Sequence, residues 1–162
     1  MNAMGKIGWI LALILAIGLG AMSYTFLVKG QTVPYADGRT SILLSPDERN
    51  QVLGEMRAVL EGTRTIIEDA VAGDMQAAEK QARSMGMAAA KQDTAIIAKL
   101  PLDFKSLGLG LHGSFDDLAD FIAENPDPLK VVDEVSTLMV QCVACHDAYR
   151  LGIEGEADIS GE

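Results

Sequence analysis

The sequence predicts an all-α protein: an antiparallel four-helix bundle preceded by one N-terminal transmembrane helix. Residues 7–28 carry no charged side chain, and an apolar run of this length can cross a bilayer as an α-helix. Between residues 45 and 151, four segments repeat apolar residues at helical spacing and are joined by short connections, which is typical of an antiparallel bundle. No segment has a convincing strand pattern.

The apolar run lies between Lys6 and Lys29 and is longer than the core of a cleaved signal peptide, which favours a retained anchor over residues 1–29. A cleavage site at Gly20-Ala21 remains the alternative. Small residues recur at every fourth position of the run, a pattern that lets a second membrane helix approach closely. This stripe consists of Gly8, Ala12, Ala16 and Gly20. We therefore expect one spanning helix and an integral-membrane partner that packs against the stripe.

The anchor is followed by about 130 residues, enough for one domain with a modest core. Residues 30–44 contain Gly30, Pro34 and Gly38 and are expected to form a tether. The acidic residues 152–162 are expected to form a flexible tail. Because the formal net charge is −10, nucleic acid is not expected as a partner, and a basic redox partner protein suits the chain better.

The predicted bundle occupies residues 45–151. Its first helix begins after Ser45, because Pro46 suits the first helical position, and it ends at Gly73. A second helix is expected over residues 75–100, where alanines on one face permit close packing.

The boundary between the last two predicted helices is marked by a helix-capping residue, Asp127. Three glycines weaken helix propensity before the third helix, so whether residues 102–110 are already helical is left open. The fourth helix begins at Asp127, with Pro128 at its first position. Its apolar stripe continues into Cys142 and Cys145, which places both cysteines on the side that faces the core.

The string Cys142-Val143-Ala144-Cys145-His146 matches the attachment signature of a c-type haem. Two thiols must reach two vinyl groups on one edge of a porphyrin, and cysteines three residues apart on a helix lie on one face. The imidazole of His146 can then bind the iron from the same side. The chain has no other cysteine, so a zinc site lacks its second ligand pair, and no strand-helix alternation surrounds the motif as in a thioredoxin-type dithiol. The sequence predicts one covalently attached haem c.

A c-type haem is attached outside the bacterial cytoplasm, so the motif places the domain after the anchor in the periplasm. The expected localisation is the bacterial inner membrane, with a single span and the C-terminal domain in the periplasm. The sequence offers no acid-base pair and no substrate pocket, and an enzymatic activity is not expected.

Only 16 residues follow His146, and none of them is Met, His or Lys, so a sixth iron ligand has to come from upstream. This arrangement resembles the cytochrome c′ family, a four-helix bundle that carries its haem on the last helix. The resemblance covers roughly residues 45–151 and is carried by Cys142-Val143-Ala144-Cys145-His146-Asp147-Ala148-Tyr149-Arg150. It implies that Cys142 and Cys145 form the thioethers and that His146 is the proximal ligand.

The resemblance also implies two kinds of distal side. Low-spin relatives place a methionine of the first helix on the iron and transfer electrons, and Met56 on the inward stripe is the best candidate, with ordinary core packing as the alternative. The family's arginine, expected four residues before that methionine, is replaced by Val52. Arg49 and Arg57 are the nearby candidates for contact with the haem propionates.

A second alignment of the first helix with the family predicts a five-coordinate iron in place of a six-coordinate one. If Arg49 is the family's arginine, the distal residue is Leu53 and the iron is five-coordinate, as in relatives that bind nitric oxide or carbon monoxide. His112 is a third candidate for the sixth ligand. The alternative is that it is an exposed histidine at the start of a helix with no ligand role.

The predicted function is therefore a membrane-anchored periplasmic monohaem cytochrome that carries single electrons, in the setting of a respiratory or photosynthetic membrane complex. The alternatives are a five-coordinate gas sensor or scavenger and a structural accessory subunit of a membrane complex. Acidic residues gather around the third helix, where they either steer a basic partner or form a solvated face. They are Asp116, Asp117, Asp120, Glu124 and Asp127.

Overall fold

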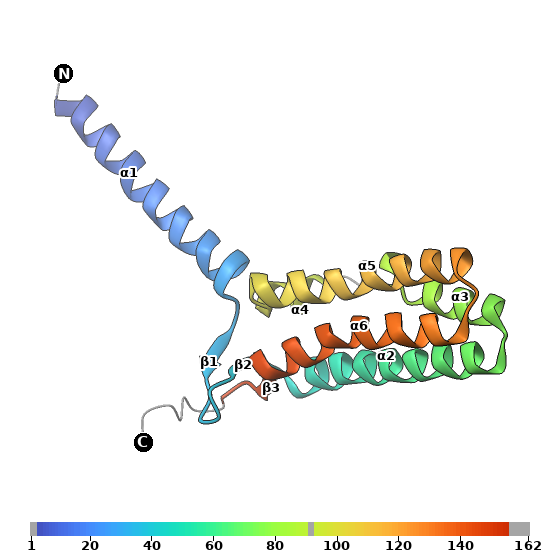
Figure 1. The fold of residues 1–162 in the computed structure, drawn as a ribbon. Helices are drawn as coiled ribbons and strands as arrows, with labels where there is room; N and C mark the ends of the chain where they lie inside the picture. The colour runs from blue at the N-terminus through green and yellow to red at the C-terminus, as the bar shows by residue number, and fades with distance from the viewer. Residues whose placement is uncertain (1–2, 91–92, 156–162) are drawn as a thin grey trace.

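The fold is described over residues 3–90 and 93–155 in a computed structural model of the chain. The apolar N-terminal segment forms α1 (Ala3–Ser23), which continues into a π-helical turn, η1 (Tyr24–Lys29). The span Ile7–Lys29 has a mean hydropathy of 2.2 and is not buried against the rest of the chain. Figure 1 shows α1 projecting away from the helical domain. The expected apolar N-terminal helix is confirmed, and its length and composition suit a membrane span or a signal sequence.

The helical domain begins with α2 (Pro46–Ala72), whose two ends are set by local chemistry. The Ser45 hydroxyl accepts a hydrogen bond from the backbone N–H of Glu48, and the Glu48 carboxylate accepts one from the N–H of Ser45. This reciprocal pair is a capping box. Gly73 ends the helix with a φ of 83°, a left-handed conformation that suits glycine. Both predicted ends of the first helix are confirmed.

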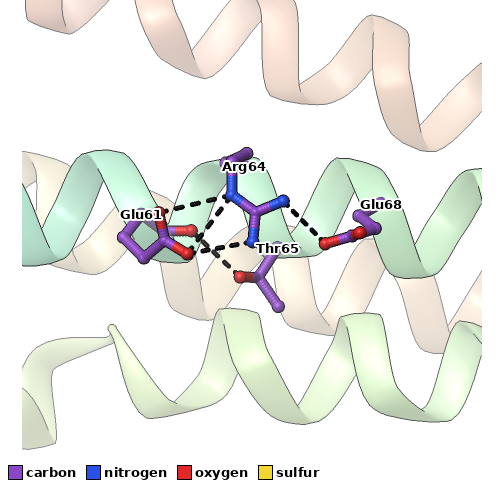
Figure 2. Close-up of polar contacts among 4 residues, drawn as sticks. All are labelled: Glu61, Arg64, Thr65 and Glu68. Atoms are coloured by element: carbon purple, nitrogen blue, oxygen red, sulfur yellow. Dashed lines mark hydrogen bonds and ion pairs between the residues drawn. The ribbon is translucent and has the colours of Figure 1, made fainter.

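The exposed face of α2 carries a small charged network (Figure 2). The Arg64 guanidinium lies 2.9 Å from a carboxylate oxygen of Glu61 and 2.7 Å from one of Glu68. The Thr65 hydroxyl donates to the carbonyl of Glu61 at 3.0 Å. The three charged side chains are more than half exposed, so solvent screens these pairs and they support the helix only weakly.

The prediction of a single helix over residues 75–100 is wrong. The chain forms α3 (Met75–Ser84), a 3₁₀ turn η2 (Met87–Ala89) and a short α4 (Thr94–Lys99) instead. The break occurs where Asp116 reaches in from α5 (Leu102–Glu124): its carboxylate accepts a hydrogen bond from the Met87 N–H at 2.8 Å. The same carboxylate fills the space where a side chain at Gly86 would lie. A tertiary contact therefore interrupts a segment whose own composition favours a helix.

Two long helices complete the bundle. α5 (Leu102–Glu124) includes residues 102–110, so the segment left open by the sequence is helical. α6 (Pro128–Ala148) begins as predicted, because the Asp127 side chain accepts hydrogen bonds from the N–H groups of Leu129 and Lys130. The helices α2, α3, α5 and α6 run in alternating directions (Figure 1).

The expectation of a purely all-α fold is wrong, because a small mixed sheet accompanies the helices. Its strands are β1 (Thr32–Pro34), β2 (Thr40–Leu44) and β3 (Tyr149–Ile153), in the order β1-β2-β3. β1 and β2 are antiparallel, whereas β2 and β3 are parallel, with Thr40 opposite Tyr149 and Leu44 opposite Ile153.

The sheet uses segments that the sequence predicts to be unstructured. The expected tether, residues 30–44, contains β1 and β2, and the expected tail, residues 152–162, begins inside β3. Residues 156–162 of that tail lie outside the described residues. Ile42 and Leu44 have no exposed surface, so burial of these two side chains draws the tether into the domain.

The domain has two apolar clusters, one at each end. α3 packs against α2 and α5, α5 packs against α6, and α6 packs back against α2, which closes the ring. The cluster at the end remote from α1, which we call the far core, consists of Ile66, Ala70, Ala78, Ala82, Met85, Phe115, Leu118, Ala119, Ile122, Val131, Val135 and Leu138. The cluster beside the sheet, which we call the near core, consists of Ile42, Leu44, Val52, Ile96, Leu100, Phe104 and Leu151.

Candidate functional site

The two cysteines lie in the last turns of α6, one turn apart, and both are half-buried free thiols. Burial raises the pKa of the Cys142 thiol and of the Cys145 thiol above the usual value of 9.0. The C-terminal end of a helix also disfavours a negative charge. Both groups are therefore neutral thiols at neutral pH, unlike the low-pKa thiolates of redox dithiols.

His146 follows Cys145 in the same turn, and its side chain is exposed. Its backbone carbonyl accepts a hydrogen bond from the guanidinium of Arg39 at 3.4 Å. Within the described residues no three His, Cys, Asp or Glu side chains are grouped as a metal site.

The near core brings the motif next to the first helix of the bundle. Cys145 packs against the near core from α6, and Tyr149 packs beside it in an edge-on contact with Phe104, with ring centres 5.4 Å apart. Met56 and Leu53 of α2 pack against the same cluster, and both are half-buried. Each of the two residues predicted as alternatives for the distal position therefore shares an apolar environment with a motif cysteine.

A cavity of about 440 Å³ lies between α2, α4 and α5, and its walls include near-core residues as well as Met85 of the far core. This volume is within the range of ligand and cofactor pockets. Its walls are mainly apolar, and polar side chains from α2 and α5 add to the lining. The apolar residues include Val52, Val59, Ile96, Leu100 and Phe104, and the polar ones include Gln51, Glu55, Lys105 and His112. The two cysteines, His146 and Met56 are not among the residues that line it.

His112 is half-buried and held in one orientation. Its Nδ1 lies 2.7 Å from the carbonyl oxygen of Met85. Because a carbonyl only accepts, Nδ1 carries the proton, and Nε2 is the nitrogen left to accept a proton or bind a metal. The structure places this third ligand candidate on the cavity wall, whereas Met56 lies in the near core.

The two arginines predicted to contact propionates differ in their surroundings. The Nε of Arg49 donates to the backbone carbonyl of Leu151 at 3.0 Å, which ties α2 to β3. Arg57 is exposed on α2. Arg49 therefore has a structural contact in addition to any role toward a cofactor.

Two cations lie near the motif, Arg39 and Arg150, and the sequence assigned a functional role to neither of them. Arg39, in the β1–β2 turn, reaches the His146 carbonyl and forms an ion pair with Asp37 at 2.7 Å, and this contact lowers the pKa of the Asp37 carboxyl. The Arg150 guanidinium lies 3.7 Å from the ring centre of Tyr35. The parallel pairing of β2 with β3 creates this arrangement between residues more than a hundred positions apart. Only the basic residue after Tyr149 was visible in the sequence as part of the motif.

The acidic residues of α5 are partly engaged within the domain. Asp120 and Asp116 face Arg83 of α3, with N–O distances of 2.5 Å and 3.9 Å, and Asp116 also holds the Met87 N–H. Asp127 caps α6. The predicted steering cluster is therefore in part a structural link between α3 and α5.

Comparison with known proteins finds no family model, no curated protein and no solved structure that matches this chain.

Proposed function

We propose that the chain is a membrane-anchored, periplasmic, monohaem c-type cytochrome of the cytochrome c′ kind, and that it carries single electrons. The observation that carries the proposal is the Cys-x-x-Cys-His motif, with two free thiols one turn apart on the last helix of a helical domain. Both thiols are half-buried, and Cys145 packs against the near core.

The residues at this end of the domain fit a covalently attached haem in their chemistry. Neutral thiols beside an apolar cluster suit addition to vinyl groups, and the apolar cavity between α2, α4 and α5 provides volume next to that cluster. Arg57 is exposed on α2 and is available for the acidic edge of such a group, whereas Arg49 also holds the Leu151 carbonyl and Arg39 is paired with Asp37. When bound, the haem supplies a one-electron iron couple whose potential depends on its ligands and its burial.

The chain's own residues hold and enclose that group. Cys142 and Cys145 attach it to α6, and His146 offers an imidazole from the same helix. Met56 is the proposed sixth ligand from α2, because it is half-buried and packs against the same apolar cluster as Cys145. The apolar near core would cover one side of the group, and burial of this kind tunes its potential.

The N-terminal helix suggests where the cytochrome works. We assign α1 as a retained single span of the bacterial inner membrane, with Trp9 and Tyr24 near its two ends. The Gly8, Ala12, Ala16, Gly20 stripe is exposed along α1, which supports an integral-membrane partner at that face. The domain then passes electrons to a membrane complex or to carriers that come to the membrane surface.

One observation favours a second candidate function, the binding of a diatomic gas at a five-coordinate iron. Leu53 packs against the near core as Met56 does, and the adjoining cavity has space for a small ligand. The choice between the two candidates depends on which of these side chains faces the iron.

Covalent attachment is the direct test. The full chain is produced with a haem c maturation system, denatured, and extracted with acidified organic solvent. We expect the haem to stay with the polypeptide, because thioether bonds survive this treatment. The double variant Cys142→Ser, Cys145→Ser should lose it. Val143→Ala keeps the spacing of the motif and should retain the haem. Complete extraction of haem from the unchanged chain would contradict the proposal.

A further inference from the structure

We propose that the side of the helical domain nearest α1, formed by η1 and the first turns of α5, docks on the lipid headgroups of the bilayer that α1 crosses. This inference rests on the part of the proposed function in which α1 is a retained membrane span. The sequence predicted a domain that moves freely on a tether. In the docked arrangement one defined face of the domain lies against the membrane.

The first support is the joint that follows η1. Gly30 has a φ of 64°, a left-handed conformation that suits glycine. It is buried against the backbone between α4 and α5, where an added Cβ would lie 2.5 Å from the Lys99 carbonyl oxygen and 2.6 Å from backbone atoms of Leu100 and Pro101. The next residue, Gln31, donates its N–H to the same Lys99 carbonyl at 2.7 Å. Backbone contacts therefore fix the direction in which the chain leaves the membrane helix.

The second support is that the joint is tied to both α5 and the sheet. The ammonium group of Lys105 on α5 reaches the carbonyl of Leu27 in η1 at 3.4 Å. A cation at the carbonyl end of a helix is favourable. The carbonyl of Gln31 accepts a hydrogen bond from the N–H of Leu43 in β2 at 2.8 Å. The end of the membrane helix is thus held by α4, α5 and β2 together, and Figure 1 shows α4 and the start of α5 beside it.

The third support is the distribution of charge along α5. Residues 102–114 carry one acidic and one basic side chain, Asp103 and Lys105, and the side chain of Leu102 is 47% exposed. Residues 115–124 carry four acidic side chains and no basic one. The near-neutral, partly apolar half lies beside η1, and the acidic half lies away from it (Figure 1). An exposed leucine with Lys29 and Lys105 suits the headgroup region, whereas a cluster of carboxylates suits water.

Docking on this face has a consequence for the candidate haem site. α4 and α5 lie on the side from which α1 arrives, and α2 and α6 form the other side of the domain (Figure 1). Lipid would then cover the start of α5 and leave the Cys142–His146 motif on α6 open to partners in the aqueous phase.

The test uses the full chain, reconstituted in phosphatidylcholine vesicles that contain phosphatidylglycerol. A photoreactive benzophenone amino acid replaces Leu102 in one variant. In the matched control it replaces Leu129, which is 82% exposed at the start of α6. In a third variant it replaces Phe26, within the apolar span. After illumination, protein-lipid adducts are counted by mass spectrometry. We expect adducts at positions 26 and 102, and on the order of ten-fold fewer at position 129.

Any other pattern of adducts would contradict the docking, and each pattern would identify a different cause. Adducts at 26 with few at 102 show that the anchor is retained and that the domain does not lie on the lipid. Few adducts at both positions show that α1 itself is not in the bilayer, which also removes the anchor from the proposed function. Equal adducts at 102 and 129 show contact without a preferred face. In native membranes, a protein adduct at 102 in place of lipid would assign this face to a protein partner.

The joint can be broken separately. Gly30→Ala places a methyl group against backbone atoms, and we expect it to abolish the lipid adducts at 102 while those at 26 remain. Gly38→Ala is the matched control, because Gly38 also has a positive φ, 88°, but open space around its Cβ position. If Gly30→Ala leaves the adducts at 102 unchanged, the joint does not hold the domain on the membrane.

Discussion

The far core and the near core lie at opposite ends of one helical domain, and they are packed differently. In the far core, side chains from α2, α3, α5 and α6 meet directly, and Ile66, Phe115 and Val131 have no exposed surface. At the near core the short α4 takes the place of a long helix, and a cavity of about 440 Å³ adjoins the cluster. Ile42 and Leu44 have no exposed surface there, but Val52, Phe104 and Leu151 each keep 9% exposure.

The difference separates residues that stabilise the fold from residues that are available for function. A close-packed apolar cluster needs no further partner. An apolar cavity costs stability, because its walls lose contacts that they would otherwise make. Neither cysteine lines the cavity, but it lies against the near core on which Cys145 packs, so a group bound at this end would complete the packing of the domain.

The largest expected effect comes from opening the far core. Phe115→Ala should lower the free energy of unfolding by about 3–5 kcal/mol, because a fully buried ring is replaced by a void. Urea unfolding followed by circular dichroism measures this, with Leu129→Ala on the exposed surface as the control. A loss below about 1 kcal/mol would mean that the far core relaxes around the void and is not the more rigid end.

Two glycine substitutions in helices should differ in the size of their effect. Gly108→Ala on α5, at the cavity, meets nothing within 4 Å and should stabilise by about 0.5–1 kcal/mol through higher helix propensity. Gly62→Ala places a methyl group where the end of the Met85 side chain lies, so this thioether has to shift and should offset part or all of the same gain. The same denaturation experiment compares the two variants. Equal stabilisation by both variants would show that the Met85 side chain moves aside at no cost.

Met56→Ala tests whether the near core serves a cofactor. In the haem-loaded protein we expect loss of the weak far-red absorption band of methionine-ligated ferric haem and a gain of rapid carbon monoxide binding. The stability change should be modest, about 1–2 kcal/mol, because the side chain is half-buried. Leu53→Ala is the matched control and should retain the band. A high-spin unchanged protein that already binds carbon monoxide would transfer the distal position to Leu53 and favour gas binding.

The smallest effect concerns the ion pairs at the near end. Lys99 lies 2.6 Å from carboxylate oxygens of both Glu48 and Glu154, which raises the pKa of Lys99 and lowers that of Glu48. The Glu48 contribution is present above its usual pKa of 4.5 and is lost as the pH falls through the lowered value. The Lys99 contribution is present below 10.5 and is lost as the pH rises through the raised value.

Lys99→Met should therefore cost about 1 kcal/mol or less between pH 6 and 9. As the pH falls through the lowered pKa of Glu48, the difference from the unchanged chain should shrink, because Glu48 becomes protonated in the unchanged protein as well. Thermal unfolding from neutral to acidic pH gives the profile. A cost that stays constant after the Glu48 carboxylate has been protonated would assign the effect of Lys99 to packing and not to charge.

Several parts of the fold could be predicted because their causes are local. The apolar N-terminal helix follows from one uninterrupted run of residues, and the ends of α2 and the start of α6 follow from Ser45, Gly73 and Asp127. The Cys-x-x-Cys-His spacing on a helix likewise places Cys142 and Cys145 one turn apart without reference to the rest of the chain. Each of these depends on residues within a few positions of one another.

The remaining features were decided by tertiary contacts. The helix expected over residues 75–100 is broken by Asp116 of another helix. The expected tether becomes two strands because β3, more than a hundred residues later, pairs with β2. The same pairing brings Arg39 to the carbonyl of His146. A strand of three to five residues has too weak a pattern to be seen in the sequence, and its stability comes from a partner that only the folded chain supplies.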